Sequence, residues 1–360
     1  MAKQPKRNWL SRLSFGTVCL VAAGLLVLGY LSVVIDPAKA WFFTLFGLLY
    51  PLVLPFTLIL FVLSLFRRSS MRGLLLLVLL PSIFFAGRYY QPRRQGPNGE
   101  AALKVVSYNV GLFAHGPKGM DRLALADSVS RYLMDMDADI ICLQEFFLPS
   151  GQPLDSWLPR HFPGYQAEFY VRNGKSGHFG NLTLSRQRVT DRGRINFEHS
   201  TNMALWTDIR LDHSTIRLYN CHFESYNISI PGLFKIEPSV EAVEETEQKM
   251  RRSITERPKQ VSAVLKDVDG APVRSLVAGD FNDNPLSYTY FRLLRGRQDA
   301  FVKVGKGFGA TYRSLWPLLR IDYILHPEDL EAVSFYIDKV HYSDHYPVIV
   351  TYNESGRDSQ

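Results

Sequence analysis

Six short polar motifs in the C-terminal three quarters of the chain each follow an apolar, strand-like segment. They are SYN (107–109), LQE (143–145), NCH (220–222), GDFN (279–282), RID (320–322) and SDH (343–345). Carboxylate, amide and imidazole groups of this kind provide hard oxygen ligands for a divalent cation, a base, and a donor for developing negative charge. Together the motifs predict metal-assisted chemistry on phosphate esters, which no single motif would indicate.

The elements that must position these motifs are short strands with a few helices between them. Strands are expected at 103–110, 140–143, 166–171, 182–185, 203–211, 215–220, 275–278, 321–325, 332–336 and 348–352, and helices at 120–134 and 239–267. Polar residues at strand ends gather at one edge when the strands lie in a pair of packed sheets. The pattern therefore predicts one α/β domain with its functional residues along a single rim.

Charge divides the chain into two unlike parts. Residues 1–94 contain 11 Lys or Arg and one acidic residue, Asp36. Subtracting these from the chain totals of 41 and 34 leaves 30 basic and 33 acidic residues for 95–360. The formal net charge of +7 therefore comes from the N-terminal part. The nearly neutral remainder argues against tight, non-specific binding of duplex nucleic acid, which relies on many Lys and Arg contacts to phosphate.

Three apolar runs predict a membrane region over 1–90 with two to three transmembrane helices, at about 15–35, 41–66 and 73–90. The first two are long enough to cross the hydrocarbon core of a bilayer. The third is doubtful because its apolar part, 73–87, has only 15 residues and contains Pro81. A linker is expected at 91–101, a catalytic domain at 102–353 and a C-terminal tail at 354–360.

Basic residues beside these runs predict the orientation of the membrane region. Clusters precede the first run and separate the second from the third: Lys3, Lys6, Arg7 and Arg12, then Arg67, Arg68 and Arg72. Such clusters favour the cytoplasmic side. If the third run spans the membrane, everything after Tyr90 lies outside the cytoplasm; if it lies in the interface, the domain is cytoplasmic. The two clusters favour an integral protein of the cell membrane with its catalytic domain on the extracytoplasmic side.

In order and wording, the six motifs resemble those of the endonuclease/exonuclease/phosphatase superfamily. This superfamily includes pancreatic-type deoxyribonucleases, apurinic endonucleases, inositol polyphosphate phosphatases and neutral sphingomyelinases. The resemblance extends over about 103–352, and six motifs in the family order are far more specific than LQE or GDFN alone. It implies a four-layered α/β sandwich, in which two packed mixed β-sheets are flanked by helices. It also implies cleavage of a phosphate ester assisted by Mg²⁺, with Mn²⁺ as the alternative cation.

The resemblance implies which residues bind metal and water. Glu145 is similar to the principal metal ligand of the family, with Asn109 beside it and Asp344 as a second acid on the metal side. Asp280 resembles the aspartate that orients or deprotonates the attacking water, and Asn282 resembles the amide that holds this water and the phosphate.

The remaining site residues are expected to face the phosphate. His345 is similar to the histidine that contacts the scissile phosphate, and Asp322 to the carboxylate that orients it. His222 falls where many members place a second phosphate-contacting histidine, although a histidine on a strand is often a core residue. Asp283 and Asn284 lie in a run rich in turn formers, so we interpret them as loop residues rather than ligands.

The sequence thus predicts a membrane-anchored, metal-dependent phosphoesterase. The alternative is a catalytically silent family member that binds a phosphorylated or protein partner. Such a module would be free to lose Glu145, Asp280 or His345, and all three are present. Nucleic acid, a phospholipid head group and a small phosphate ester all remain open as substrates, and so does the oligomeric state.

Overall fold

The computed structural model describes residues 9–92, 103–198, 200–212, 214–226 and 240–353. The chain forms two compact units that divide after Gly87, with Leu286–Tyr288 grouping with the first. The predicted C-terminal tail, most of the predicted linker and the basic residues before Trp9 lie outside the described residues.

The first unit consists of apolar helices. They are α1 (Trp9–Leu31), α2 (Phe43–Phe66), α3 (Met71–Leu79) and α4 (Ser82–Phe85). The 3₁₀ turn η1 (Ala86–Arg88) follows, and its last residue belongs to the second unit. Among the residues that the structure describes, three segments are long and apolar enough to cross a membrane, namely Ser14–Leu31, Phe43–Phe66 and Met71–Arg88. The third has 18 residues, the same length as the predicted segment 73–90, and is shifted toward the N-terminus by two residues. Its helix begins at Met71, and Leu80 and Pro81 keep α-helical dihedral angles.

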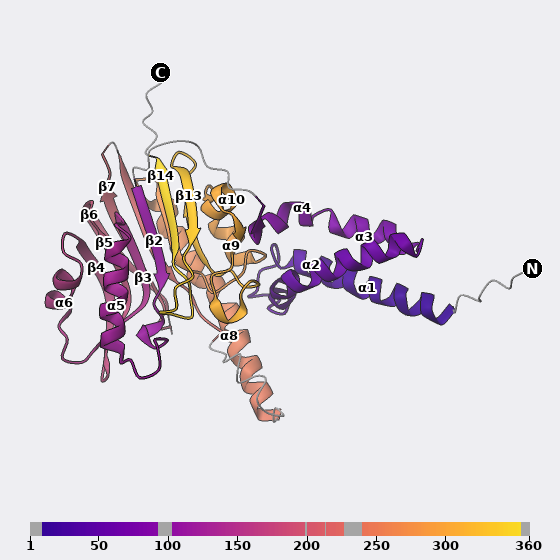
Figure 1. The fold of residues 1–360 in the computed structure, drawn as a ribbon, viewed down its shortest axis with the longest axis horizontal. Coiled ribbons are helices and arrows are strands. Elements are labelled where there is room, and N and C mark those ends of the chain that lie inside the picture. Colours follow the sequence, from indigo (N-terminus) through magenta and orange to yellow (C-terminus); the bar gives the residue numbers. More distant parts are fainter. Residues whose placement is uncertain (1–8, 93–102, 199, 213, 227–239, 354–360) are drawn as a thin grey trace, which may run out of the picture. The chain divides into compact units, whose positions relative to one another are not determined.

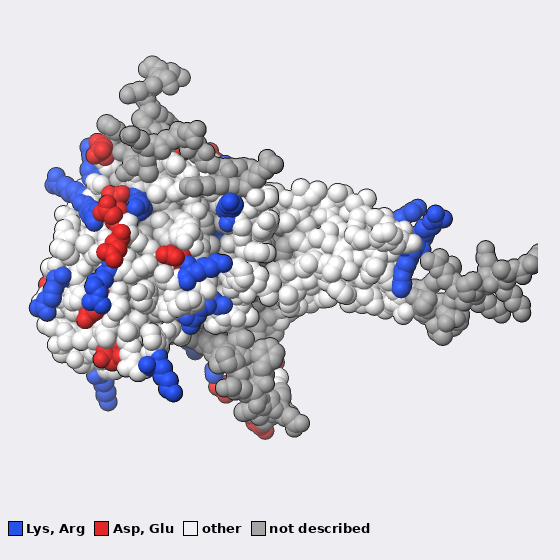
Figure 2. Space-filling view, viewed as in Figure 1, with Lys and Arg blue, Asp and Glu red and all other residues white. Residues whose placement is uncertain are grey.

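The surface of this unit is apolar. Cys19, Ala22, Leu60 and Leu75 form a small buried cluster between the helices, whereas many other apolar side chains point outward, among them Phe66, which is 82% exposed. Figure 2 shows this face of the helices without charged side chains along their length, and Lys or Arg only at the end where α2 and α3 are joined. An apolar surface with charge confined to a helix end is typical of membrane-spanning helices.

The second unit contains two six-stranded sheets (Figure 1). The first has the order β13-β14-β2-β3-β5-β4 and comprises β2 (Leu103–Asn109), β3 (Ile140–Pro149), β4 (Gln166–Gly174), β5 (Gly177–Ser185), β13 (Glu331–Ile337) and β14 (Val348–Asn353). The second has the order β10-β12-β9-β8-β7-β6 and comprises β6 (Arg188–Asn196), β7 (Met203–Arg210), β8 (Thr215–His222), β9 (Ser275–Asp280), β10 (Gln298–Asp299) and β12 (Asp322–His326). Each sheet is mixed, because β2 pairs with β3 and β8 with β9 in parallel, while the other neighbours are antiparallel.

Helices cover the outer face of each sheet and produce four layers. They are α5 (Arg122–Asp135), α6 (Leu154–His161), α8 (Val240–Gly270) and α9 (Tyr288–Leu293). The short helix α10 (Ala300–Val304) packs instead against the core between the sheets. Side chains alternate between faces along a strand. Val105 and Leu218 therefore lie in the core between the sheets, Val106 packs beneath α5 and α6, and Tyr219 packs beneath α8 and α9. This is the predicted four-layered α/β sandwich.

Every strand and helix predicted for this unit has a counterpart, but some elements were missed. Strand β6 reads RVTDRGRIN, with no apolar alternation, because it is an exposed edge strand. Helix α6 has only eight residues and contains Pro159. Strand β3 was predicted to end at Leu143 but continues to Pro149, because an irregularity between Leu143 and Phe146 lets pairing resume. The turn between β7 and β8 includes His213, which lies outside the described residues.

Candidate active site

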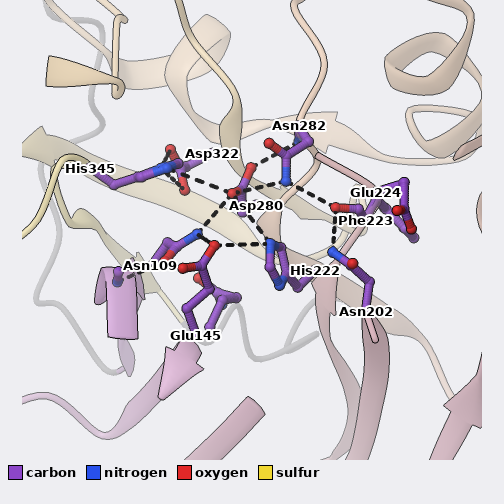
Figure 3. A network of polar contacts seen from close by, with 12 residues as sticks. Asn109, Glu145, Asn202, His222, Phe223, Glu224, Asp280, Asn282, Asp322 and His345 are labelled. Carbon is purple, nitrogen blue, oxygen red and sulfur yellow. Dashed lines mark hydrogen bonds and ion pairs between the residues drawn. The ribbon is translucent and has the colours of Figure 1, made fainter. Parts of the chain in front are cut away.

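The site forms where two pairs of parallel strands end. In the first sheet, β2 ends at Asn109, and Glu145 of β3 directly follows Gln144, the last residue of β3 that pairs with β2. In the second, β8 and β9 end at His222 and Asp280, which are Cα partners in the ladder. Figure 3 shows these four side chains pointing toward one another from the two sheets. Parallel neighbours with a common carboxyl edge explain why motifs distant in the sequence meet here.

A bulge in β3 aims Glu145 at this rim. Leu143 pairs with Leu182 and Phe146 with Gly180, so Gln144 and Glu145 together oppose the single residue Asn181. Glu145 adopts φ +50°, a left-handed conformation that non-glycine residues seldom adopt outside special sites. The side chain is 30% exposed, so it reaches the opening of the site. Bulges commonly re-aim a side chain beside an active site.

Asn109 links the carboxylates of the two sheets. Its Nδ2 donates to Asp280 Oδ2 at 2.9 Å and to Glu145 Oε1 at 3.3 Å. Its Oδ1 accepts from the backbone N–H of Gly111 at 3.0 Å. In this arrangement Asn109 holds the two acids in place, and its amide oxygen, the atom that would bind a metal, faces Gly111.

The GDFN turn shapes the surroundings of Asp280. Gly279 adopts φ +131°, and a Cβ there would lie 1.9 Å from the carbonyl oxygen of Cys221, so only glycine fits. The backbone N–H of Asn282 donates to Asp280 Oδ1 at 2.8 Å, and its Nδ2 donates to the carbonyl of Phe223 at 2.9 Å. Asp280 is 1% exposed. The backbone contact immobilises Oδ1 of Asp280, while Oδ2 accepts from Asn282 Nδ2 at 3.2 Å and faces Asn109 and the two histidines.

His345 and Asp322 form a buried, hydrogen-bonded pair. His345 Nδ1 lies 2.9 Å from Asp322 Oδ2 and 3.2 Å from Oδ1, and its Nε2 lies 3.8 Å from Asp280 Oδ2. The backbone N–H of Asp322 donates to Thr311 Oγ1 at 3.1 Å, and that of His345 donates to Ser343 Oγ at 3.2 Å. The imidazole is therefore turned so that Nε2 faces the site.

The charges in the site shift two pKa values. Burial alone would lower the pKa of His345, but the carboxylates of Asp322 and Asp280 outweigh it and raise this pKa to about 10. Burial, together with the charge of Asp322, raises the pKa of Asp280 to about 6, although both histidines oppose this shift. At neutral pH His345 is thus a cation, and Asp280 is an unusually basic carboxylate.

His222 lies beside both acids without a hydrogen bond at Nε2. This atom is buried and has no hydrogen-bonding partner among the described residues. It lies 3.5 Å from Glu145 Oε1 and 3.9 Å from Asp280 Oδ2. The alternative interpretation is a core histidine whose two ring nitrogens are both hydrogen-bonded. Such a residue would not leave a buried nitrogen facing two carboxylates without a hydrogen bond.

Asp344 takes a more peripheral position. Its Oδ1 lies 3.3 Å from His115 Nε2 and 3.3 Å from Ser343 Oγ, and the side chain is 22% exposed. The hydroxyl of Ser343 also donates to the backbone carbonyl of Asn109 at 2.8 Å. Asp344 therefore lines the opening near the first sheet.

Three residues of the site have ligand atoms close enough to one another to hold a metal ion. The oxygens of Asp280 and Asp322 and a nitrogen of His345 lie within 4.8 Å of one another. The hydrogen bond between Asp322 and His345 already accounts for much of this proximity, so we do not take these three as the metal ligands. Glu145 is more exposed than Asp280 or Asp322 and faces His222 Nε2. A carboxylate oxygen that is open to solvent suits a hard cation that retains water.

Sequence reasoning missed a buried polar layer beneath the site. Gln144 Nε2 donates to Asn220 Oδ1 at 2.7 Å, and Asn220 Nδ2 donates to the carbonyls of Leu143 and Leu182 at 3.2 and 3.0 Å. Asn181 Nδ2 donates to the carbonyl of Asn220 at 3.1 Å. These amides tie the two sheets together. The sequence could have revealed these residues, because each is an amide within an otherwise apolar strand. Gln144 and Asn220 also belong to the LQE and NCH motifs.

Arg257 of α8 was also missed. Its Nη1 lies 3.2 Å from Asp283 Oδ2, and its Nε and Nη2 donate to the carbonyl of Glu224 at 3.0 and 2.9 Å. Arg257 and Asp283 are 1% and 2% exposed. The pair joins the loop after His222 to the loop after Asp280. Asp283 is thus engaged in a buried ion pair with Arg257.

A family model described as Endonuclease/Exonuclease/phosphatase family matches residues 106–345. The chain belongs to this family. As a member, it is a hydrolase acting on phosphate ester bonds. The apolar N-terminal part matches a second model, described as a domain of unknown function (DUF8431), over residues 11–89. No match was found among curated proteins.

Solved structures share the fold of the family domain. An endonuclease/exonuclease/phosphatase family protein from Leptotrichia buccalis is 17% identical with a TM-score of 0.52, covering 70% of this chain and 100% of its own. A protein of this type from Bacteroides vulgatus is 17% identical with a TM-score of 0.51, covering 70% and 98%. The human Nocturnin catalytic domain with bound sulfate is 16% identical with a TM-score of 0.50, covering 73% and 99%. At these identities the likeness concerns the fold alone.

Proposed function

We propose that this family member is a membrane-anchored, divalent-metal-dependent phosphoesterase that cleaves phosphodiester or phosphomonoester bonds by attack of water. The observation that carries the proposal is the meeting of Glu145, Asp280, His222 and His345 within 3.5 to 3.9 Å contacts. This arrangement combines a carboxylate for a cation, a basic carboxylate for water and a protonated imidazole for phosphate.

We assign Glu145 as the principal ligand of Mg²⁺ or Mn²⁺, with Asn109 and Asp344 beside it. The residues fit a hard cation, because among the described residues the carboxylates of the site outnumber the cations that face them, and His222 Nε2 has no hydrogen-bonding partner there. When bound, such a cation lowers the repulsion between an anionic phosphate and an incoming water oxygen. Asn109 contributes through its hold on Glu145 and Asp280, and Asp344 through its place at the opening.

The chain's own residues divide the remaining work. Asp280, with its pKa raised to about 6, accepts a proton from the attacking water, and Asn282 holds the turn that positions it. Protonated His345 donates through Nε2 to a phosphoryl oxygen, while Asp322 keeps the imidazole charged and oriented. His222 offers Nε2 to the same phosphate. As the water oxygen bonds to phosphorus, the ester P–O bond breaks, and the departing alcohol oxygen takes a proton from solvent.

We place the family domain on the extracytoplasmic side of the cell membrane. Among the described residues, three helices are long and apolar enough to cross a membrane, and three crossings would put the family domain on the side opposite the N-terminus. Arg67, Arg68 and Arg72 lie in or beside the connection between α2 and α3, and basic residues of this kind favour the cytoplasm. A C-terminal fusion to a reporter that works only outside the cytoplasm tests this placement. Activity of a cytoplasm-specific reporter at the same position would reverse it.

The activity test uses the full-length protein in detergent or nanodiscs with Mg²⁺. Candidate substrates are single- and double-stranded nucleic acid, a phospholipid with a phosphate ester head group, and a chromogenic phosphomonoester. We expect turnover of at least one class, and loss of turnover in both Asp280→Ala and His345→Ala. Folded protein that binds Mg²⁺ but turns over none of them would instead support a module that binds a phosphorylated or protein partner.

A further inference from the structure

Three aromatic side chains of the second unit are exposed, and one of them, Phe308, lies against each of the other two. Tyr90 of β1 (Tyr90–Gln91) pairs with Phe308 of β11 (Gly307–Phe308), with ring centroids 5.1 Å apart. Trp316 follows the 3₁₀ turn η3 (Arg313–Leu315), and its ring lies 5.9 Å from that of Phe308. Tyr90, Phe308 and Trp316 are 47%, 48% and 41% exposed. We call these three residues the aromatic surface. Contiguous exposed apolar groups of this kind mark an interaction site.

The aromatic surface begins immediately after an apolar helix. Arg88 is the last residue of the third segment long enough to cross a membrane, and Tyr90 follows two residues later, a distance of at most about 7 Å along the chain. Arg88 is itself held within the second unit. Its carbonyl accepts from Arg320 Nη1 at 3.2 Å, and its guanidinium lies 5.0 Å from the ring centre of Phe291.

A cation accompanies the rings. Lys339 Nζ lies 3.9 Å from the ring centre of Trp316. Trp and Tyr rings are enriched where a bilayer meets water, because one side of each ring is apolar and the other can bind polar groups. A lysine beside them is attracted to anionic lipid phosphate. The aromatic surface and Lys339 therefore combine residue types that proteins place in the lipid head-group region.

We propose that the aromatic surface is the face with which the family domain binds the lipid bilayer. Tyr90, Phe308 and Trp316 enter the head-group region, and Lys339 contacts lipid phosphate. The proposal rests on the membrane anchoring put forward in the proposed function.

Binding of the aromatic surface has a consequence for the active site, because Tyr312 and Arg313 lie between Phe308 and Trp316 in the chain. Tyr312 forms a β-bridge with His345, and the N–H of Arg313 donates to the carbonyl of Asp344 at 2.8 Å, so the bound loop borders the catalytic residues.

The test measures how close the aromatic surface lies to lipid. Phe308→Cys is labelled with an environment-sensitive fluorophore in the full-length protein, reconstituted into nanodiscs of phosphatidylcholine and phosphatidylglycerol. The matched control is Phe169→Cys on β4, since Phe169 is 39% exposed and lies on an edge strand. The three native cysteines are free and buried, and unsubstituted protein gives the labelling background. A second labelled variant, Trp316→Cys, guards against local disturbance at Phe308.

Lipids carrying a nitroxide at the head group provide the readout. We expect the nitroxide lipids to quench the fluorescence of the Phe308 and Trp316 probes at least about twice as strongly as that of the Phe169 probe. Equal quenching at all three positions would overturn the proposal. Probes that are shielded from aqueous quenchers but not quenched by lipid would also overturn it, because a protein segment would then cover the surface. Hydrolysis is measured on the same samples. Lipid quenching without hydrolysis would refute the proposed function alone, and hydrolysis without quenching would refute this inference alone.

Discussion

The buried pair of Asp322 and His345 leads to a quantitative prediction for Asp322→Asn. The substitution keeps the size of the side chain and removes one negative charge at 2.9 Å from His345 Nδ1. Two charges about 4 Å apart interact by about 4 kcal/mol at the effective dielectric constant of a protein site, which corresponds to about 3 pKa units. The pKa of His345, raised to about 10 in the native protein, should therefore fall to about 7.

This change should move both limbs of the pH–rate profile toward lower pH. If activity requires protonated His345, the native enzyme retains about 90% of its active form at pH 9 and the variant about 1%. The acid limb should also move down from near pH 6, because Asp322 contributes to raising the pKa of Asp280. A loss in overall rate is expected as well, because an asparagine amide can turn its NH₂ group toward His345 Nδ1 and no longer accept the hydrogen bond that orients the ring. The test therefore uses the shape of the pH–rate profile and not the overall rate.

The assay is the rate at saturating substrate and metal between pH 5 and 9.5, together with NMR titration of the histidine ring. His345→Gln identifies the resonance. The matched control is Asp329→Asn, because Asp329 is 45% exposed and pairs with Arg274 away from the motifs. An alkaline limb that stays within about one pH unit of the native limb in Asp322→Asn would refute the assignment of Asp322 as the source of the His345 charge.

Four further outcomes are expected. Glu145→Gln should raise the Mg²⁺ concentration for half-maximal activity about tenfold or more, whereas direct phosphate contact would change KM instead. Asp280→Asn should lower kcat about 10²- to 10⁴-fold with little change in KM, and an unchanged kcat would remove Asp280 as the base. EDTA should abolish activity, with recovery on adding Mg²⁺ or Mn²⁺, and activity that survives chelation would contradict metal dependence. Arg257→Met should lower the free energy of unfolding by about 3–5 kcal/mol, because it leaves Asp283 buried and uncompensated. Adding Asp283→Asn should restore part of this loss in chemical denaturation.

Local patterns were sufficient for most of the fold. Strands such as β2 and β9 are buried along most or all of their length, and such strands appear in the sequence as continuous apolar runs. Strand β6 was missed because an exposed edge strand has no apolar face to reveal it. The third apolar helix was the doubtful one, because the uncharged run 73–87 is short, whereas the helical segment that could span a membrane extends from Met71 to Arg88 and includes an arginine at each end.

The sequence by itself determined which residues are available for catalysis, their order in the family pattern, and the presence of apolar segments long enough for a membrane. These depend on residue type and on spacing over a few positions. Tertiary structure decided what each motif contacts. Asn109 and Asp280 are 171 positions apart and share a hydrogen bond of 2.9 Å. The direction of Glu145 depends on a bulge opposite Asn181, and the charge of His345 depends on two carboxylates from β9 and β12. Electrostatic and hydrogen-bonding effects act over a few ångströms in space, so no pattern along the chain could have supplied them.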